Sequence, residues 1–261
     1  MSEGNCFLPE SHLLARSLSL LQRPHHTPDY KSLNTILGQL VEQQNLVYGE
    51  VANSIYQKAA YRAELSVALK IQTLINRPTY PTRHLENWLA DFQALEYREL
   101  SRLTPEQISA LLMAVKHPIS IITGGPGRGK TYVLRTLVQW LTSRGVNVAL
   151  AAPTGKAANR MKEATGMEAS TIHRLLQWQG LGQNFYYNED NPLTIDWLIV
   201  DEFSMVDIFL FNSLLKALPT KTQILLVGDS DQLPSVGPGM VLRDLLNSEI
   251  VPTTIGGKKI P

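Results

Sequence analysis

The chain has 261 residues, of which 44% are hydrophobic, and it carries a formal net charge of +1. Its length allows one large domain or two smaller ones, and its balanced charge gives no global sign of nucleic-acid binding. The single cysteine, Cys6, excludes an internal disulfide and is expected to be a small buried residue in a reducing compartment. No apolar run approaches the roughly 18–20 residues of a membrane span, and no signal-peptide pattern is present. We therefore expect a soluble cytoplasmic protein with no membrane partner.

The first part of the chain, residues 1–80, differs in pattern from the rest and predicts a small N-terminal module. Apolar residues recur at helical spacing in residues 33–40 and 61–75, and residues 45–51 favour a short strand. Helices with a short hairpin predict a mainly helical module that resembles a winged helix. Residues 81–102 predict a helical connector between this module and the remainder of the chain.

Residues 103–255 alternate between apolar strand patterns and helix patterns. This alternation predicts an α/β fold in which a parallel sheet is covered by helices on both faces. Ligands of such folds bind at the carboxyl ends of the strands. The last six residues, 256–261, are expected to form a divergent tail. The predicted strands are residues 119–123, 146–152, 197–200 and 223–227.

The segment at residues 119–131 reads ISIITGGPGRGKT, an apolar strand and a glycine-rich loop that lead into a helix. It fits the pattern G-x-x-x-x-G-K-T, whose backbone N–H groups surround phosphates at a helix N-terminus. Lys130 is expected to reach the β- and γ-phosphates of ATP, and the Thr131 hydroxyl to hold Mg²⁺. An ordinary glycine turn is the alternative, which the flanking strand and helix disfavour. The predicted ATP-binding residues of this loop are Gly124, Gly125, Pro126, Gly127, Arg128, Gly129, Lys130 and Thr131.

Two acids, Asp201 and Glu202, follow the apolar strand at residues 197–200. In a P-loop ATPase the first acid holds Mg²⁺ from the strand tip, and the second would polarise the attacking water. A pair of solvated loop acids is the alternative. After the next strand, Gln232 is placed to contact the γ-phosphate and Asp229 to orient groups around the metal. We therefore predict Lys130, Glu202 and Gln232 as catalytic residues, and Thr131 and Asp201 as Mg²⁺ ligands.

Gln107 lies three residues after Thr104 and before the first strand of the α/β region. The spacing fits a capping box at a helix start, and a glutamine here would equally be able to hydrogen-bond an adenine edge. The residues themselves leave these two roles open.

Two further strand-to-helix loops carry Thr154, Lys156 and His173. Their hydroxyl, ammonium and imidazole groups suit contacts with a phosphodiester backbone. The alternatives are ordinary helix caps and a solvated basic face.

Five motifs in order resemble the RecD-like DNA helicases of superfamily 1, including the stand-alone type and the exodeoxyribonuclease V alpha-chain type. The resemblance implies an ATP- and Mg²⁺-dependent motor that moves 5′ to 3′ along single-stranded DNA or a 5′-tailed duplex, in repair and recombination. It favours adenine recognition by Gln107, γ-phosphate sensing by Gln232, and DNA contacts by Thr154, Lys156 and His173. The motifs read LTPEQ, GGPGRGKT, APTGKAA, IVDEFSMVD and VGDSDQLPSVGPG.

Three features depart from that family. Arg128 stands where threonine is usual in the loop, and Phe203 replaces a small residue after the two acids. The family also has a second motor domain that supplies an arginine to the γ-phosphate, which this sequence does not contain. We therefore expect this chain alone to bind Mg-ATP and hydrolyse it poorly unless a partner chain supplies the second domain. A small-molecule kinase and a non-catalytic nucleotide-binding remnant are the alternatives.

Overall fold

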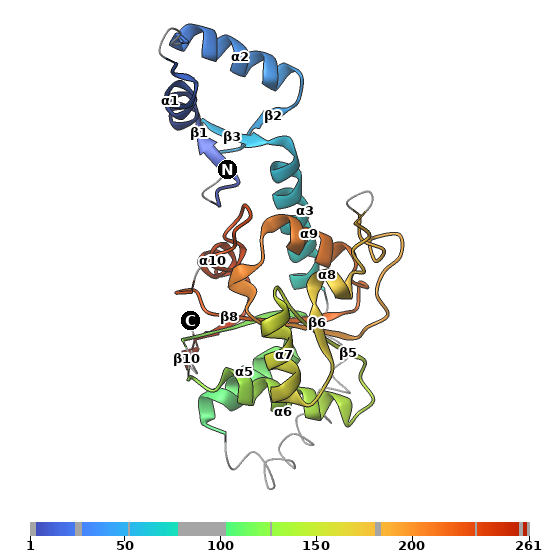
Figure 1. Cartoon of the computed structure of the whole chain (residues 1–261). Helices are drawn as coiled ribbons and strands as arrows, with labels where there is room; N and C mark the ends of the chain where they lie inside the picture. The colour runs from blue at the N-terminus through green and yellow to red at the C-terminus, as the bar shows by residue number, and fades with distance from the viewer. Residues whose placement is uncertain are drawn as a thin grey trace.

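The computed structural model describes residues 4–23, 28–51, 53–77, 103–125, 127–180, 184–232, 234–255 and 258–259. The predicted connector at residues 81–102 and the loop residue Pro126 lie outside these ranges. A small N-terminal module stands at one end of the molecule, and a larger α/β domain forms the rest (Figure 1).

The N-terminal module combines two helices with a three-stranded antiparallel sheet in the order β1-β3-β2. The predicted helix at residues 33–40 lies within α2, and the predicted strand at 45–51 contains β2. Leu14, Leu33, Leu37 and Ile55 form its small core. The sequence analysis missed α1, although its Leu14 is buried in this core. The elements are β1 (Phe7–Pro9), α1 (Glu10–Leu21), α2 (Tyr30–Glu42), β2 (Leu46–Tyr48) and β3 (Ser54–Gln57).

One long helix, α3 (Lys58–Ile75), joins this module to the α/β domain. Its buried residues, from Ala60 to Leu74, belong to the same core cluster as Phe211 and Leu214 of the α/β domain. The helix predicted at residues 61–75 is confirmed and begins three residues earlier. α3 therefore connects the two parts of the chain (Figure 1), and its buried residues share one apolar core with both of them.

The α/β domain is built on a seven-stranded sheet in the order β10-β9-β4-β8-β7-β5-β6, in which only β10 runs antiparallel. The predicted α/β fold with a parallel sheet is confirmed. The short outer strands β6, β9 and β10 were not predicted. The strands are β4 (Ile119–Thr123), β5 (Val148–Ala152), β6 (Ala169–Thr171), β7 (Trp197–Val200), β8 (Gln223–Gly228), β9 (Thr253–Ile255) and β10 (Lys258–Lys259).

Helices cover both faces of this sheet, because apolar side chains alternate between its two sides. Ile121, Val200 and Leu226 belong to the core shared with α3, α9 and α10, whereas Ile122 and Ile199 pack with α5, α6 and α7 on the other face. The helices are α5 (Pro105–Lys116), α6 (Lys130–Thr142), α7 (Gly155–Thr165), α8 (Ile172–Leu175), η2 (Phe203–Met205), α9 (Ile208–Lys216) and α10 (Val241–Asn247). None of the helices in the described ranges combines the length and the apolar composition that crossing a bilayer requires.

Candidate nucleotide site

Three of the predicted motifs follow three neighbouring strands of the sheet. β4, β8 and β7 lie side by side and run parallel, so their carboxyl ends share one edge. A cavity of about 700 Å³ lies at this edge. The convergence brings together most of the predicted phosphate-binding, metal-binding and catalytic residues. The cavity is lined by Gly125, Gly127, Arg128, Gly129, Lys130, Thr131, Tyr132, Leu134, Arg135, Arg160, Glu163, Ala164, Asp201, Glu202, Gly228 and Gln232.

The glycine loop turns the chain from β4 into α6, and α6 begins at Lys130. Gly127 and Gly129 both have φ of +75°, a conformation that glycine adopts without the penalty of a side chain. The free N–H groups of the first turn of α6 therefore face the cavity together with the positive end of the helix dipole. This geometry suits an anionic group such as a triphosphate.

The Lys130 ammonium lies inside the loop. Its Nζ donates to the carbonyl oxygen of Gly124 and, at 3.1 Å, to that of Gly125. Among the described residues no acid forms a salt bridge with it, so its charge is available to a phosphate. Arg128 is exposed and lines the same cavity, which places this unusual cation beside the site.

The two acids after β7 lie in an environment that disfavours their ionised forms. Burial raises the pKa of Asp201, although the N–H of Glu202, 2.9 Å from its Oδ1, and the charge of Lys130 partly oppose the shift. Burial and the charge of Asp201 raise the pKa of Glu202, and Lys130 and Arg160 oppose that shift. A cation bound between these acids and the loop would remove the electrostatic penalty.

Glu202 has φ of +52°, in the left-handed region that non-glycine residues seldom adopt. The next residue, Phe203, is completely buried and packs edge-on against Phe211, with ring centroids 4.9 Å apart. The unusual phenylalanine therefore anchors the turn that carries the two acids.

Gln232 follows β8, is exposed, and lines the same cavity as the glycine loop. Its Nε2 donates to Oδ2 of Asp229 at 3.4 Å. Asp229 is buried, and its Oδ1 accepts from the N–H of Asp231 at 3.1 Å. Asp229 thus fixes the loop that presents Gln232.

Gln107 makes the capping box that its spacing predicts. Thr104 Oγ1 accepts from its N–H at 3.3 Å, and its own Oε1 accepts from the N–H of Thr104 at 3.0 Å. Its Nε2 lies against Gly129 of the glycine loop, although Gln107 does not line the cavity itself. The structure therefore shows the capping role and places the amide nitrogen beside the nucleotide loop.

The predicted DNA-binding residues lie at a different part of the sheet edge. β5 and β6 pair so that Ala152 faces Thr171, and Thr154 and His173 each follow two residues later. Thr154 is the N-cap of α7 and accepts from the N–H of Ala157 at 3.2 Å, while Lys156 and His173 are exposed. All three lie outside the nucleotide cavity, as expected of a second site.

Sequence reasoning missed several residues of these two sites. Arg135 of α6 and Arg160 of α7 line the nucleotide cavity. Arg135 lies four positions after the predicted site residue Thr131, and Arg160 lies four positions after Lys156. That spacing places side chains on one face of a helix and was the signal available.

An aromatic cluster beside His173 was also missed. The ring of His173 lies 5.8 Å from that of Phe185 and 6.2 Å from that of Trp178, which is 44% exposed. Trp178 and Phe185 are joined by an isolated β-bridge that no periodicity indicates.

Comparison with known proteins gives a consistent assignment. Residues 107–238, about half of the chain, match the family described as AAA domain. The chain is 40% identical over 215 residues to the ATP-dependent RecD2 DNA helicase of Deinococcus radiodurans, covering 80% of this chain and 29% of that protein. It is 35% identical over 200 residues to the RecBCD enzyme subunit RecD of Haemophilus influenzae, covering 62% and 31%.

A crystal structure of the Pif1 helicase from Candida albicans aligns with a TM-score of 0.43 and 26% identity, covering 61% of this chain and 40% of that one. The chain thus spans about 30% of the length of its two curated relatives. The chain belongs to the AAA domain family, and it is similar in sequence to proteins of the RecD helicase type.

Proposed function

We propose that residues 103–255 are the ATP-binding motor domain of a RecD-like DNA helicase, which couples ATP hydrolysis to movement 5′ to 3′ along single-stranded DNA in repair and recombination. One observation carries the proposal. The glycine loop, the acid pair and Gln232 come from three separate strands and line one cavity, as the ordered motifs of such a motor require. The similarity to a protein named as an ATP-dependent DNA helicase supports the same function.

The residues present fit Mg-ATP. Mg²⁺ is usually bound by one or two carboxylates together with phosphate oxygens and water, and Thr131 and Asp201 offer such oxygens at one cavity. Bound Mg²⁺ would neutralise phosphate charge and hold the phosphates in line for attack. Lys130 would exchange its carbonyl partners in the loop for phosphate oxygens, and Arg128 would add a second cation from the exposed side.

Catalysis in this proposal depends on two side chains. Glu202, next to the metal ligand Asp201, would accept a proton from the attacking water. Gln232 would hydrogen-bond the γ-phosphate and report its presence to the β8 loop, where Asp229 holds it. Gln107 would add an adenine contact through its amide nitrogen.

Movement on DNA would use the neighbouring strand ends. Thr154, Lys156 and His173 would contact the DNA backbone, and β7 joins them to the nucleotide site because it pairs with both β5 and β8. A second motor domain, in further sequence or in a partner chain, would supply the other half of the DNA track and an arginine for the γ-phosphate. Without it, Mg-ATP would bind and turn over slowly.

The proposal is tested by measuring Mg-ATP binding and ATP hydrolysis by the purified chain at low salt, with and without single-stranded DNA. We expect binding together with slow hydrolysis that DNA accelerates. A chain that binds no Mg-ATP would overturn the proposal. Binding with no hydrolysis, whether or not DNA is present, would leave only the nucleotide-binding remnant.

A further inference from the structure

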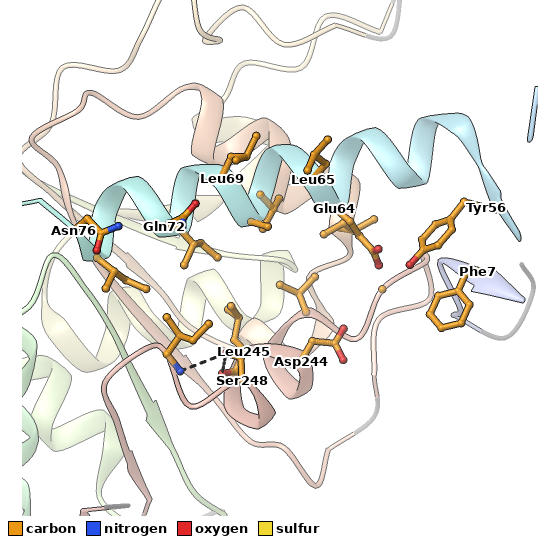
Figure 2. A pocket seen from close by; sticks show the side chains of 18 residues that line it. Phe7, Tyr56, Glu64, Leu65, Leu69, Gln72, Asn76, Asp244, Leu245 and Ser248 are labelled. Carbon is orange, nitrogen blue, oxygen red and sulfur yellow. Dashed lines mark hydrogen bonds between the residues drawn. The ribbon is translucent and has the colours of Figure 1, made fainter. Parts of the chain in front are cut away.

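A second cavity, of about 760 Å³, lies between α3 and α10. Figure 2 shows α3 along one side, the short helix α10 along the other, and the rings of Phe7 and Tyr56 at one end. None of its lining residues lines the nucleotide cavity. Its volume is within the range of about 300–1,000 Å³ that is typical of binding sites. We call it the α3–α10 groove.

Apolar side chains form most of the groove and continue over the outside of α3. Leu65 and Leu69 line it with 45% and 55% of their surfaces exposed, and Ile250 with 60%. Leu65 and Leu69 lie one helical turn apart and also line an adjoining hollow of about 370 Å³. Exposed apolar strips of this kind, bordered by polar residues, mark surfaces that bind other segments.

Two carboxylates interrupt this apolar surface. Glu64 comes from α3 and Asp244 from α10, and both line the groove beside Tyr56 (Figure 2). Within the described ranges, neither forms a salt bridge. Asp244 is exposed at the mouth of the groove, and Glu64 is half-buried. Two acidic groups that form no salt bridge in this part of the chain, beside apolar walls, favour a cationic occupant.

The surroundings of Glu64 keep its carboxylate in this position. The pKa of the Cys6 thiol is raised by burial and by its interaction with Glu64. The pKa of the Tyr56 hydroxyl is raised by the same two causes. Both groups therefore stay protonated and act as donors to Glu64. Burial and the charge of Glu64 also raise the pKa of Asp244, and the neighbouring cation Arg243 opposes this shift. Glu64 and Asp244 thus interact electrostatically across the groove.

We propose that the α3–α10 groove binds a partner peptide segment that places an arginine or lysine side chain between Glu64 and Asp244 and apolar neighbours on Leu65 and Leu69. A basic side chain matches both parts of the groove, because its alkyl stem packs on apolar surface while its charged end meets the carboxylates. The strip over α3 extends beyond the cavity, so an elongated segment covers it better than a small molecule does. Nucleic acid is disfavoured because its phosphates would face two acids.

The test begins with selection of a random 12-residue peptide library on the immobilised full chain, with counter-selection on the Asp244→Asn variant and without nucleotide. Selected peptides are then synthesised, and their affinities are measured by fluorescence anisotropy. We expect arginine or lysine flanked by apolar residues, and at least tenfold weaker binding to Asp244→Asn. Replacing the peptide's arginine by uncharged citrulline should weaken its binding to the wild type by the same factor. The citrulline peptide should then bind the wild type and Asp244→Asn with equal affinity.

Two more variants separate docking from folding. Leu69→Ser alters an exposed side chain and should weaken the same peptides about tenfold. Glu42→Gln removes a charge from the exposed face of α2 and should change nothing, because Glu42 lines neither the groove nor the adjoining hollow. The proposal would be overturned by peptides that bind the wild type and Asp244→Asn equally well. Peptides that prefer the wild type but contain no basic residue would also overturn it. Sedimentation of the wild type as a dimer that Leu69→Ser dissociates would identify a second copy as the occupant and overturn it as well. Each result is independent of ATP binding, so it separates this proposal from the proposed function.

Discussion

The side-chain amide of Gln107 lies against the α-carbon of Gly129, so closely that a β-carbon on residue 129 would overlap Nε2. Gln107 lies in the first turn of α5 and Gly129 caps α6, so the contact joins the helix before β4 to the glycine loop after it. The capping box with Thr104 holds the side chain of Gln107 in place. Gln107 in turn leaves no space for a side chain at position 129.

Gly129→Ala should therefore damage the nucleotide site more than its size suggests. The new methyl group meets Gln107, and an alanine at φ of +75° carries a backbone penalty of about 1–2 kcal/mol. Gly166→Ala is a matched control, since Gly166 has φ of +72° and a β-carbon added there would meet no atom within 4 Å. Thermal unfolding should show a loss for both variants, and nucleotide titration a loss for Gly129→Ala alone. Equal nucleotide affinity in the two would show that the contact with Gln107 is unimportant.

Lys130→Ala should weaken Mg-ATP binding by at least tenfold, since a hydrogen bond to a charged group contributes about 1.5–3 kcal/mol. Within the described residues its side chain bonds only the carbonyls of the loop, so the fold should tolerate the change. Calorimetric titration with Mg-ATP gives the affinity, and circular dichroism controls for folding. An unchanged affinity would remove Lys130 from the proposed site.

Glu202→Gln should keep Mg-ATP binding and reduce hydrolysis by about 10²–10⁴-fold, the usual contribution of a positioned general base. Glutamine has the same shape, so the turn before the buried Phe203 should be retained. Steady-state hydrolysis and nucleotide affinity are measured on the same preparation. Parallel loss of both would mean that Glu202 acts in binding instead.

Lys156→Ala should weaken binding to single-stranded DNA and reduce the dependence of log affinity on log salt by about 0.7, the contribution of one phosphate contact. Lys162→Ala is a control on the same helix, because Lys162 is paired with Glu168 at 2.5 Å. Anisotropy titrations at several salt concentrations give both slopes. A slope that Lys156→Ala leaves unchanged would assign Lys156 to the solvated face of α7.

Asp244→Asn should change how stability depends on pH. Burial and Glu64 raise the pKa of Asp244 in the folded chain, so the folded state holds this proton more tightly than the unfolded state does. The free energy of unfolding contributed by Asp244 therefore falls as pH rises from about 4 through the raised pKa. Relative to the variant, the wild type should lose stability as pH rises from about 4 through the raised pKa, by less than about 1 kcal/mol because solvent screens the exposed carboxyl. Denaturant unfolding at several pH values measures the difference, and the opposite trend would contradict it.

Much of the sheet could be predicted because its central strands are buried on both faces. β7 consists of continuous apolar residues, β4 is rich in isoleucine, and the predicted limits of both strands are confirmed. β6 and β9 have three residues each and lie near the edges of the sheet, where burial is incomplete and the apolar signal is weak. Their pairing depends on neighbouring strands, which local sequence does not describe.

The predicted site residues are brought together wherever a motif follows a strand of known direction, as with Lys130, Asp201 and Gln232. Their individual roles stay predictions. The α3–α10 groove had no sequence signal, because Glu64 and Asp244 are 180 positions apart and meet only through the packing of α3 on the α/β domain.

The position of α3 has a mechanical consequence. The helix has 18 residues, and a helix of that length spans about 27 Å. Its buried residues share one core with α9 at one end and with Tyr56 of the N-terminal module at the other. A tilt of about 10° at α9 would therefore move the far end of α3 by about 5 Å, roughly the spacing between neighbouring β-strands. A small rotation of the α/β domain at α9 would thus be carried along α3 into a displacement of the whole N-terminal module.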